Sequence, residues 1–111
     1  MNWKKERLML ACKRLEDAEW LDNKCRLPAS DGYIDIRIED EDMYVERQYD
    51  NKYMQIILKD VWDIDDVERK HLEVRTFDGG YLSIHQASPK HYHIYAYDKN
   101  KNLIVREEVL K

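Results

Sequence analysis

Strict alternation of apolar and polar residues is the feature that most constrains how this chain folds. Residues 33–39 read Tyr-Ile-Asp-Ile-Arg-Ile-Glu, so that three isoleucines share one side of an extended chain. Because successive side chains of a β-strand point to opposite faces, this pattern predicts a strand with one buried face. Comparable runs, separated by polar turns, follow at residues 43–48, 53–59, 71–77, 81–86, 91–97 and 103–108. Together they predict an antiparallel sheet of about six to seven strands.

The N-terminal segment shows helical spacing instead. Leu8, Ala11, Leu15 and Ala18 recur at steps of three and four residues, with charged residues between them. This period is typical of an amphipathic helix, which we expect to span residues 2–23 and to pack on the apolar face of the sheet.

A second, shorter helix is expected inside the strand-rich part. Asp65 is followed three residues later by Glu68, a spacing typical of the capping box that begins a helix. We therefore predict a short helix near residues 63–69, with Trp62 packed beneath it.

The predicted fold class is α+β. At 111 residues the chain has the length of one domain, since a single hydrophobic core is typical of chains of about 100–150 residues. We expect one domain over residues 1–111, with the helix at 2–23 and the sheet at 33–110. A sheet closed into a barrel, with the helix at one end, is the alternative arrangement.

The charged N-terminus and the two cysteines indicate the compartment. The start carries Lys4, Lys5 and Arg7. No apolar run reaches the about 7–15 residues of a signal-peptide core or the about 20 residues of a membrane span. Without an export signal, Cys12 and Cys25 are expected to be reduced thiols. The sequence therefore predicts a cytoplasmic protein that does not associate with membranes.

Charge is unevenly distributed along the chain. Residues 28–68 carry four basic and thirteen acidic side chains, a net charge of −9, whereas residues 1–27 and 69–111 carry +2 and +3. A concentrated negative field is typical of proteins that bind basic partners, and tyrosine and tryptophan often anchor interfaces. The candidate partner-binding residues are Glu39, Asp40, Glu41, Asp42, Tyr44, Trp62, Asp63, Asp65 and Asp66.

These features favour a small acidic protein-binding module without catalysis or cofactor. Its size and charge are those of bacterial inhibitor and immunity proteins and of phage-encoded antagonists, an analogy of composition alone. The expected partner is another protein with a basic surface. Direct binding of nucleic acid is disfavoured, because no stripe of Lys and Arg interleaves with the aromatic residues. The chain also contains no nucleophile elbow, Walker loop or dinucleotide fingerprint.

The histidines give the main alternative. His85, His91 and His93 fall on one face of two neighbouring predicted strands. Three imidazoles with an open coordination position suit a divalent transition metal, in a binding or an enzymatic site. A third interpretation is a homo-oligomer, such as a homodimer, joined through an exposed edge strand at residues 103–110.

Overall fold

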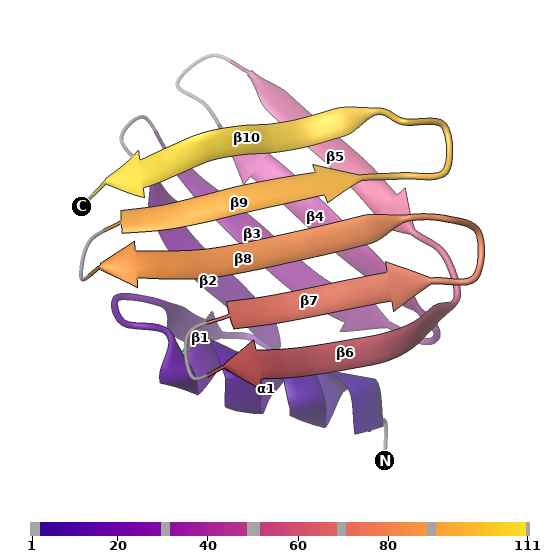
Figure 1. The fold of residues 1–111 in the computed structure, drawn as a ribbon, viewed down its shortest axis with the longest axis horizontal. Helices are drawn as coiled ribbons and strands as arrows, with labels where there is room; N and C mark the ends of the chain where they lie inside the picture. The colour runs from indigo at the N-terminus through magenta and orange to yellow at the C-terminus, as the bar shows by residue number, and fades with distance from the viewer. Residues whose placement is uncertain (1–2, 30–31, 49–51, 69–70, 89–90, 111) are drawn as a thin grey trace.

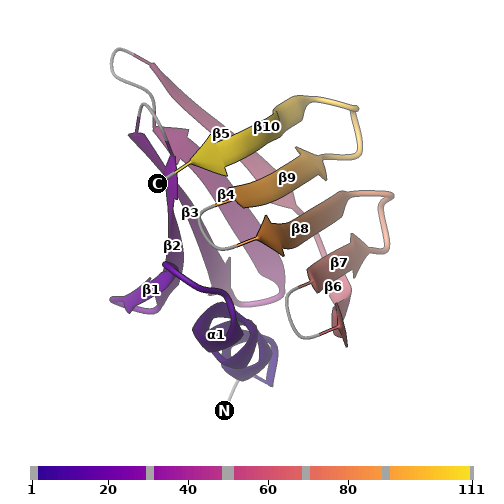
Figure 2. The ribbon, with the colours of Figure 1, turned by 60° about the vertical axis from the view of Figure 1, so that its left-hand side comes forward.

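Two five-stranded antiparallel sheets lie face to face, and a single helix packs beside them (Figures 1 and 2). The computed structural model describes residues 3–29, 32–48, 52–68, 71–88 and 91–110, without the side chains of residues 29, 66–68, 87–88 and 104–110. Helix α1 (Trp3–Arg14) comes first. The first sheet contains, in spatial order, β1 (Glu19–Leu21), β2 (Lys24–Ala29), β3 (Gly32–Glu39), β4 (Asp42–Gln48) and β5 (Tyr53–Leu58). The second contains β6 (Val61–Glu68), β7 (His71–Thr76), β8 (Tyr81–Ser88), β9 (His91–Tyr97) and β10 (Leu103–Leu110).

The chain passes from the first sheet to the second within two residues. Lys59 and Asp60 separate the end of β5 from the start of β6, and Asp60 has a left-handed φ of 54°. Asp accepts this conformation more readily than most residues, so the chain can reverse sharply here. The predicted combination of a helix with antiparallel strands is confirmed, whereas the expected single sheet of six to seven strands is wrong.

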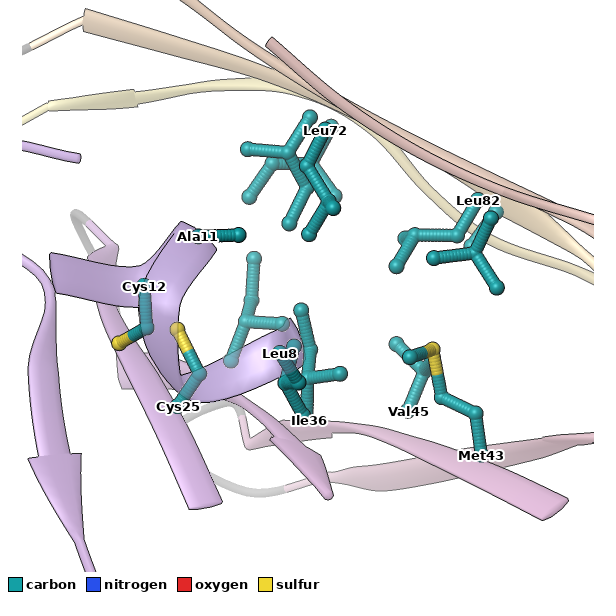
Figure 3. Close-up of a cluster of buried hydrophobic side chains, with 14 of the residues drawn as sticks. Leu8, Ala11, Cys12, Cys25, Ile36, Met43, Val45, Leu72 and Leu82 are labelled. Atoms are coloured by element: carbon teal, nitrogen blue, oxygen red, sulfur yellow. The ribbon is translucent and has the colours of Figure 1, made fainter. Parts of the chain in front are cut away.

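The hydrophobic core lies between the two sheets. Figure 3 shows Ile36 and Val45 of the first sheet opposite Leu72 and Leu82 of the second, with Leu8 of α1 beside them. The three isoleucines of the alternating segment are all buried, which confirms the predicted apolar face of that strand. A fully buried aliphatic side chain contributes about 1.5–3 kcal/mol relative to an exposed one, so this layer is the main source of stability.

Helix α1 is shorter than predicted. It ends at Arg14, and the expected helix over residues 2–23 is therefore wrong in its second half. Asp22 and Asn23 have φ angles of 45° and 67° and form a two-residue turn between β1 and β2. Two left-handed residues in succession are typical of a tight hairpin turn, and Asp and Asn tolerate that conformation. Residues 19–29 therefore form a β-hairpin, although the spacing of their apolar residues predicted a helix as far as residue 23. The strands consequently begin before residue 33.

The helix covers the open side between the sheets and does not lie across a sheet face (Figure 2). Leu8 is fully buried there. Lys4 forms an ion pair with Glu41 of the first sheet, and Arg7 Nη1 donates a hydrogen bond of 3.3 Å to Ile64 O of the second. The second sheet, and not the helix, covers the apolar face of the first. Among the described residues no strand pairing closes the two sheets into a barrel.

Strand β6 occupies the described part of the segment 63–69, where a short helix was predicted. The register with β7 shifts between Val61 and Asp63, so one residue is inserted into the strand as a bulge. As a result Val61 and Ile64, three residues apart, both point into the core, each 1% exposed. Buried residues three apart are also what an amphipathic helix shows, so the sequence pattern is ambiguous here. Pairing with β7 outweighs the local preference for a helix start that Asp65 and Glu68 indicate. The predicted helix is wrong, and Trp62 is exposed instead of packed beneath it.

Candidate functional site

The acidic run at residues 39–42 forms the turn between β3 and β4, and we call it the acidic hairpin. Glu39 and Asp42 pair in register at the ends of the two strands, and Asp40 and Glu41 make the two-residue turn. Asp40 has a φ of 54°, the left-handed conformation that such turns require. Four consecutive carboxylates are thereby held on one tight turn.

Basic side chains neutralise part of the acidic hairpin. Its ion pairs include Lys4 with Glu41, Lys59 Nζ with Asp42 Oδ2 at 3.2 Å, and Arg37 Nε with Glu39 Oε1 at 3.6 Å. The negative field at this turn is therefore weaker than the net charge of the surrounding segment suggests. The side chains of Glu39 and Glu41 nevertheless remain 56% and 68% exposed, so both carboxylates stay accessible to a partner.

Asp42 and Glu41 connect the acidic hairpin to the second sheet. The Asp60 N–H donates a hydrogen bond of 3.1 Å to Asp42 Oδ1, and the Val61 N–H donates one of 2.9 Å to Glu41 O. Burial pushes the pKa of Asp42 upward, but the bonds from Asp60 and Lys59 outweigh it and hold this pKa below its usual range. The hairpin is therefore fixed against the start of β6.

Two exposed aromatic rings stand beside this junction, and we call them the exposed ring pair. Trp62 is 47% exposed and Phe77 is 78% exposed, with their ring centroids 6.0 Å apart. The bulge at the start of β6 turns Trp62 outward. Phe77 is held at the same place, since its N–H donates a hydrogen bond of 3.2 Å to Asp60 O. Exposed apolar surface next to polar residues is typical of interaction sites.

Tyr44 also lies next to the acidic hairpin. Its half-buried ring lies beneath the guanidinium of Arg37, with 4.5 Å between Cζ and the ring centroid. An open hollow of about 540 Å³ adjoins the turn and is lined by Lys5, Ile38, Glu39, Asp40, Asp42 and Tyr44. The predicted anchor Tyr44 is thus part of the same surface, although its cation–π contact already occupies one side of the ring.

The remaining predicted residues follow β6 away from this end. Asp63 Oδ2 lies 3.3 Å from Arg75 Nη1, and exposed Asp65 pairs in register with Glu73. Asp66 pairs in backbone register with the neighbouring strand, and its side chain is outside the described residues. The structure therefore brings the acidic hairpin, Tyr44, Trp62 and Asp63 to one end and places Asp65 farther along the sheet.

Three histidines form a row across the outer face of the second sheet, which we call the histidine row. His71 pairs in register with His85, and His85 pairs with His93. The ring centroids are 5.3 Å apart in the first pair and 6.4 Å apart in the second. His91 lies two residues before His93 on β9 and pairs in register with Ser88, so it is not part of the row. The structure thus pairs His85 with His93, adds His71 to them, and pairs His91 with Ser88 instead of with another histidine.

His71 was not among the predicted site residues, because its position beside His85 depends on the register of the β7–β8 hairpin. In that hairpin Arg75 pairs with Tyr81. Counting outward in steps of two along both strands then brings His71 opposite His85. The Asp78-Gly79-Gly80 turn marked the hairpin, and a register derived from it would have found the third histidine.

Second-sheet side chains hold the His71 ring from one side. Its Nε2 lies 3.2 Å from Ser83 Oγ and 3.6 Å from Glu73 Oε1. In the part of the chain that the structure describes, no three His, Cys, Asp or Glu side chains already converge on a point where they could hold a metal ion. The row is therefore a set of neighbouring imidazoles and not a finished coordination sphere.

The two cysteines meet in the core between α1 and β2, where Figure 3 shows their sulfur atoms close together. Both are free thiols and both are buried, Cys12 at 1% and Cys25 at 0% exposure. The hydrogen bond between them, together with burial, raises the pKa of the Cys25 thiol well above its usual range. Such buried, protonated sulfur packs as a small apolar group.

Two further observations concern the class of protein. Among the described residues no helix has the length and apolar character that crossing a membrane requires. Comparison of the chain with protein-family models, curated proteins and solved structures gives no match. The features of this chain that bear on function are therefore the acidic hairpin, the exposed ring pair and the histidine row.

Proposed function

We propose that this chain is a protein-binding module that docks on a basic partner through the acidic hairpin and the exposed ring pair. The observation that carries the proposal is that these two features adjoin each other at one end of the molecule. Val61 joins them, because its N–H is bonded to Glu41 O and the next residue is Trp62. Exposed aromatic surface beside accessible carboxylates is a combination suited to a partner rich in Lys and Arg.

In this proposal the exposed ring pair supplies most of the affinity. Trp62 and Phe77 present apolar surface that binding would remove from water, at about 25 cal/mol per Å². Tryptophan is also the residue type most enriched among those whose truncation weakens complexes by about 2 kcal/mol or more. A cationic side chain of the partner could in addition lie over either ring.

In this proposal the acidic hairpin orients the basic partner as it approaches and raises the rate of association. Its ion pairs with Lys4, Lys59 and Arg37 fix the turn, while Glu39 and Glu41 remain largely exposed. Exposed charges at the rim of an interface change the association rate and its salt dependence more than they change the final affinity. The carboxylates would therefore select a basic partner, and the rings would retain it.

The class we propose is a cytoplasmic inhibitor or immunity protein of bacterial or phage origin. A chain of 111 residues with a net charge of −4 and one docking end supports this class. Such a module would act by covering a basic surface of its target, for example one that otherwise binds phosphate groups. The expected complex consists of two proteins and contains no nucleic acid.

The first experiment removes one ring and compares it with an equally exposed ring elsewhere. Trp62→Ala is expected to reduce capture of a basic partner from the lysate of the producing cells by at least about tenfold, as loss of a central anchor does. The matched control is Tyr53→Ala, because Tyr53 is 55% exposed and lies at the other end of β5. Equal capture by Trp62→Ala and the unmodified chain would contradict the docking surface.

A second experiment reverses one charge in each of two similar turns. Asp40→Lys should slow association, whereas Asp22→Lys should not, although both residues are exposed and have left-handed φ angles of 54° and 45°. Raising the salt from about 0.1 M to about 1 M, which shortens the screening length from about 10 Å to about 3 Å, should remove the difference. If neither the salt concentration nor Asp40→Lys changed the association rate, the acidic hairpin would not select the partner by charge.

A further inference from the structure

The histidine row continues across three neighbouring strands of the second sheet, β7, β8 and β9, which lie side by side in Figure 1. Three of the four histidines of the chain occupy it. His85 and His93 are exposed and His71 is half-buried, so all three rings are accessible from the same outer face. The row lies at the end of β6 where Glu68 pairs with His71, away from the exposed ring pair at the start of that strand.

The spacing of the first two rings suits a shared metal ion. A ring centre stands about 3.2 Å from a metal bound at about 2.0–2.1 Å, so two imidazoles on one tetrahedral ion have centres about 5.2 Å apart. The His71 and His85 centroids are 5.3 Å apart. The His93 ring lies 6.4 Å from the His85 ring and is nearly parallel to it, with 28° between the ring planes. It therefore has to rotate, and to approach by about 1 Å, before both rings point a nitrogen at one ion. Its ring is exposed, which leaves room for that rotation.

The contacts of His71 add an independent argument. Metal-binding histidines commonly use their second ring nitrogen to bind a hydroxyl or carboxylate, which fixes the tautomer and the ring orientation. The Nε2 of His71 lies 3.2 Å from Ser83 Oγ and 3.6 Å from Glu73 Oε1. This arrangement leaves Nδ1 as the nitrogen available for a metal ion and restricts the ring before any ion arrives.

We propose that His71, His85 and His93 bind one divalent transition-metal ion on the outer face of the second sheet. His71 and His85 form the initial pair, and His93 closes on the ion as the third ligand. Imidazole nitrogen selects Zn²⁺, Cu²⁺ or Ni²⁺ over Mg²⁺ and Ca²⁺, which prefer oxygen ligands. Because the face is open to solvent, the fourth position stays available to water or to a side chain of a partner.

Zinc titration of the full chain tests the site directly. The protein carries no polyhistidine tag, is stripped with a chelator, and is titrated with Zn²⁺ by isothermal calorimetry near neutral pH. The unmodified chain should bind one ion, and His85→Gln should weaken binding by at least about tenfold, since it removes the central ligand. His71→Gln and His93→Gln should each weaken it less. No saturable binding by the unmodified chain would overturn the proposal.

His91→Gln is the matched control, because His91 lies on the same face of β9 but pairs with Ser88. Its zinc affinity should stay within about twofold of the unmodified chain. A loss as large as that of His85→Gln would replace the row with a different histidine set, or with nonspecific binding, and would overturn the proposal. Trp62→Ala should also leave zinc binding unchanged, so failure of the docking proposal and failure of the metal site can be told apart.

A stability measurement gives the second readout. An ion that joins three strands should raise the midpoint of thermal unfolding by mass action, and the rise should vanish in His85→Gln. Lowering the pH should weaken binding, because each imidazole must lose its proton before it can bind a metal ion. A zinc-induced rise that persists in His85→Gln would place the ion elsewhere and would also overturn the proposal.

Discussion

The outer faces of the two sheets are built from different interactions. On the first sheet Asp35 is only 5% exposed, with Arg26 Nε and Nη2 at 2.9 and 3.0 Å and Lys24 Nζ at 3.3 Å from its carboxylate. The Arg26 guanidinium also lies 3.8 Å from the centroid of the Tyr33 ring. The hydrogen bonds to Asp35 raise the pKa of Arg26. On this face these charged side chains thus form ion pairs and hydrogen bonds with side chains of the neighbouring strand.

Rings, and not ion pairs, dominate much of the second face. Tyr97 has ring contacts with Tyr81 and Tyr95, at centroid distances of 5.7 and 5.6 Å, and the histidine row runs parallel to them. Opposite charges also meet on this face, where Arg75 Nη2 lies 2.6 Å from Glu73 Oε2 and Arg75 Nη1 lies 3.3 Å from Asp63 Oδ2. The polar side chains described on the first face therefore mainly stabilise the sheet by contacting one another. The second face instead exposes imidazole nitrogens and phenol groups to solvent. That difference can be tested by mutation.

The largest expected effect comes from Gly32, the first residue of β3. A Cβ added at Gly32 would lie 1.8 Å from Gln48 O, and its φ of 153° is itself unfavourable for other residues. Gly32→Ala is expected to lower the free energy of unfolding by about 3 kcal/mol or more, because it adds a backbone clash to strain.

Gly79, in the turn between β7 and β8, provides the control. It has a φ of 92°, but no atom lies within 4 Å of an added Cβ, so Gly79→Ala should cost only the strain of about 1 kcal/mol. Urea unfolding measures both values. Equal losses would show that the close approach of β3 and β4 at Gly32 does not constrain the first sheet.

The next prediction compares one residue from each outer face. Asp35→Asn should lower the free energy of unfolding by about 2–3 kcal/mol, because it leaves Arg26 and Lys24 without their shared anion. The loss is smaller than for a fully buried ion pair, because the Arg26 side chain is partly exposed to solvent. His85→Gln, measured in chelator, should change it by less than about 0.5 kcal/mol. A large loss in His85→Gln would mean that the histidine row is a structural element like the first face.

The sequence predicted strands wherever burial follows a period of two without interruption. Residues 91–97 form β9 with the expected bounds, and 33–39 and 43–48 differ from β3 and β4 by one residue. Prediction failed where the backbone departs from that period. At Asp22 and Asn23 a left-handed turn follows a segment with helical spacing, and at Val61 a bulge places side chains three residues apart on one face. The bulge is not visible in residue patterns alone, whereas the Asp22-Asn23 pair is a turn signal that the helical spacing around it outweighed.

The same limits apply to the candidate sites. The acidic hairpin could be predicted because its four carboxylates are adjacent in sequence, but the ion pair of Lys4 with Glu41 depends on where α1 packs. Trp62 could be selected by residue type, whereas its exposed partner Phe77 reaches it only through the meeting of two turns. The histidine row required the register of two hairpins. Sites formed by contacts between separate strands, turns or the helix were therefore the least predictable.

A smaller loss than that of Asp35→Asn is expected at Asp42, which links the first sheet to the start of the second. Its pKa in the folded chain is held below the ordinary value of 3.8. The unfolded chain therefore binds the proton first, so the stabilisation is complete above about pH 4 and is lost as the pH falls through the folded-state pKa. Because the Asp42 side chain is partly exposed, its contribution should be only about 0.5–1 kcal/mol after solvent screening.

Asp42→Asn should accordingly lower stability at neutral pH by that amount and reduce the loss of stability on acidification. Asp98 is the matched control, because hydrogen bonds from Asn100 and Asn102 likewise outweigh burial and lower its pKa, but within a single loop of the second sheet. Acid titration of urea unfolding for both variants separates the two carboxylates. If Asp42→Asn left the acid dependence unchanged while Asp98→Asn reduced it, the junction between the sheets would owe nothing to the Asp42 carboxylate. The backbone bond from Val61 to Glu41 would then be the contact that holds the acidic hairpin against β6.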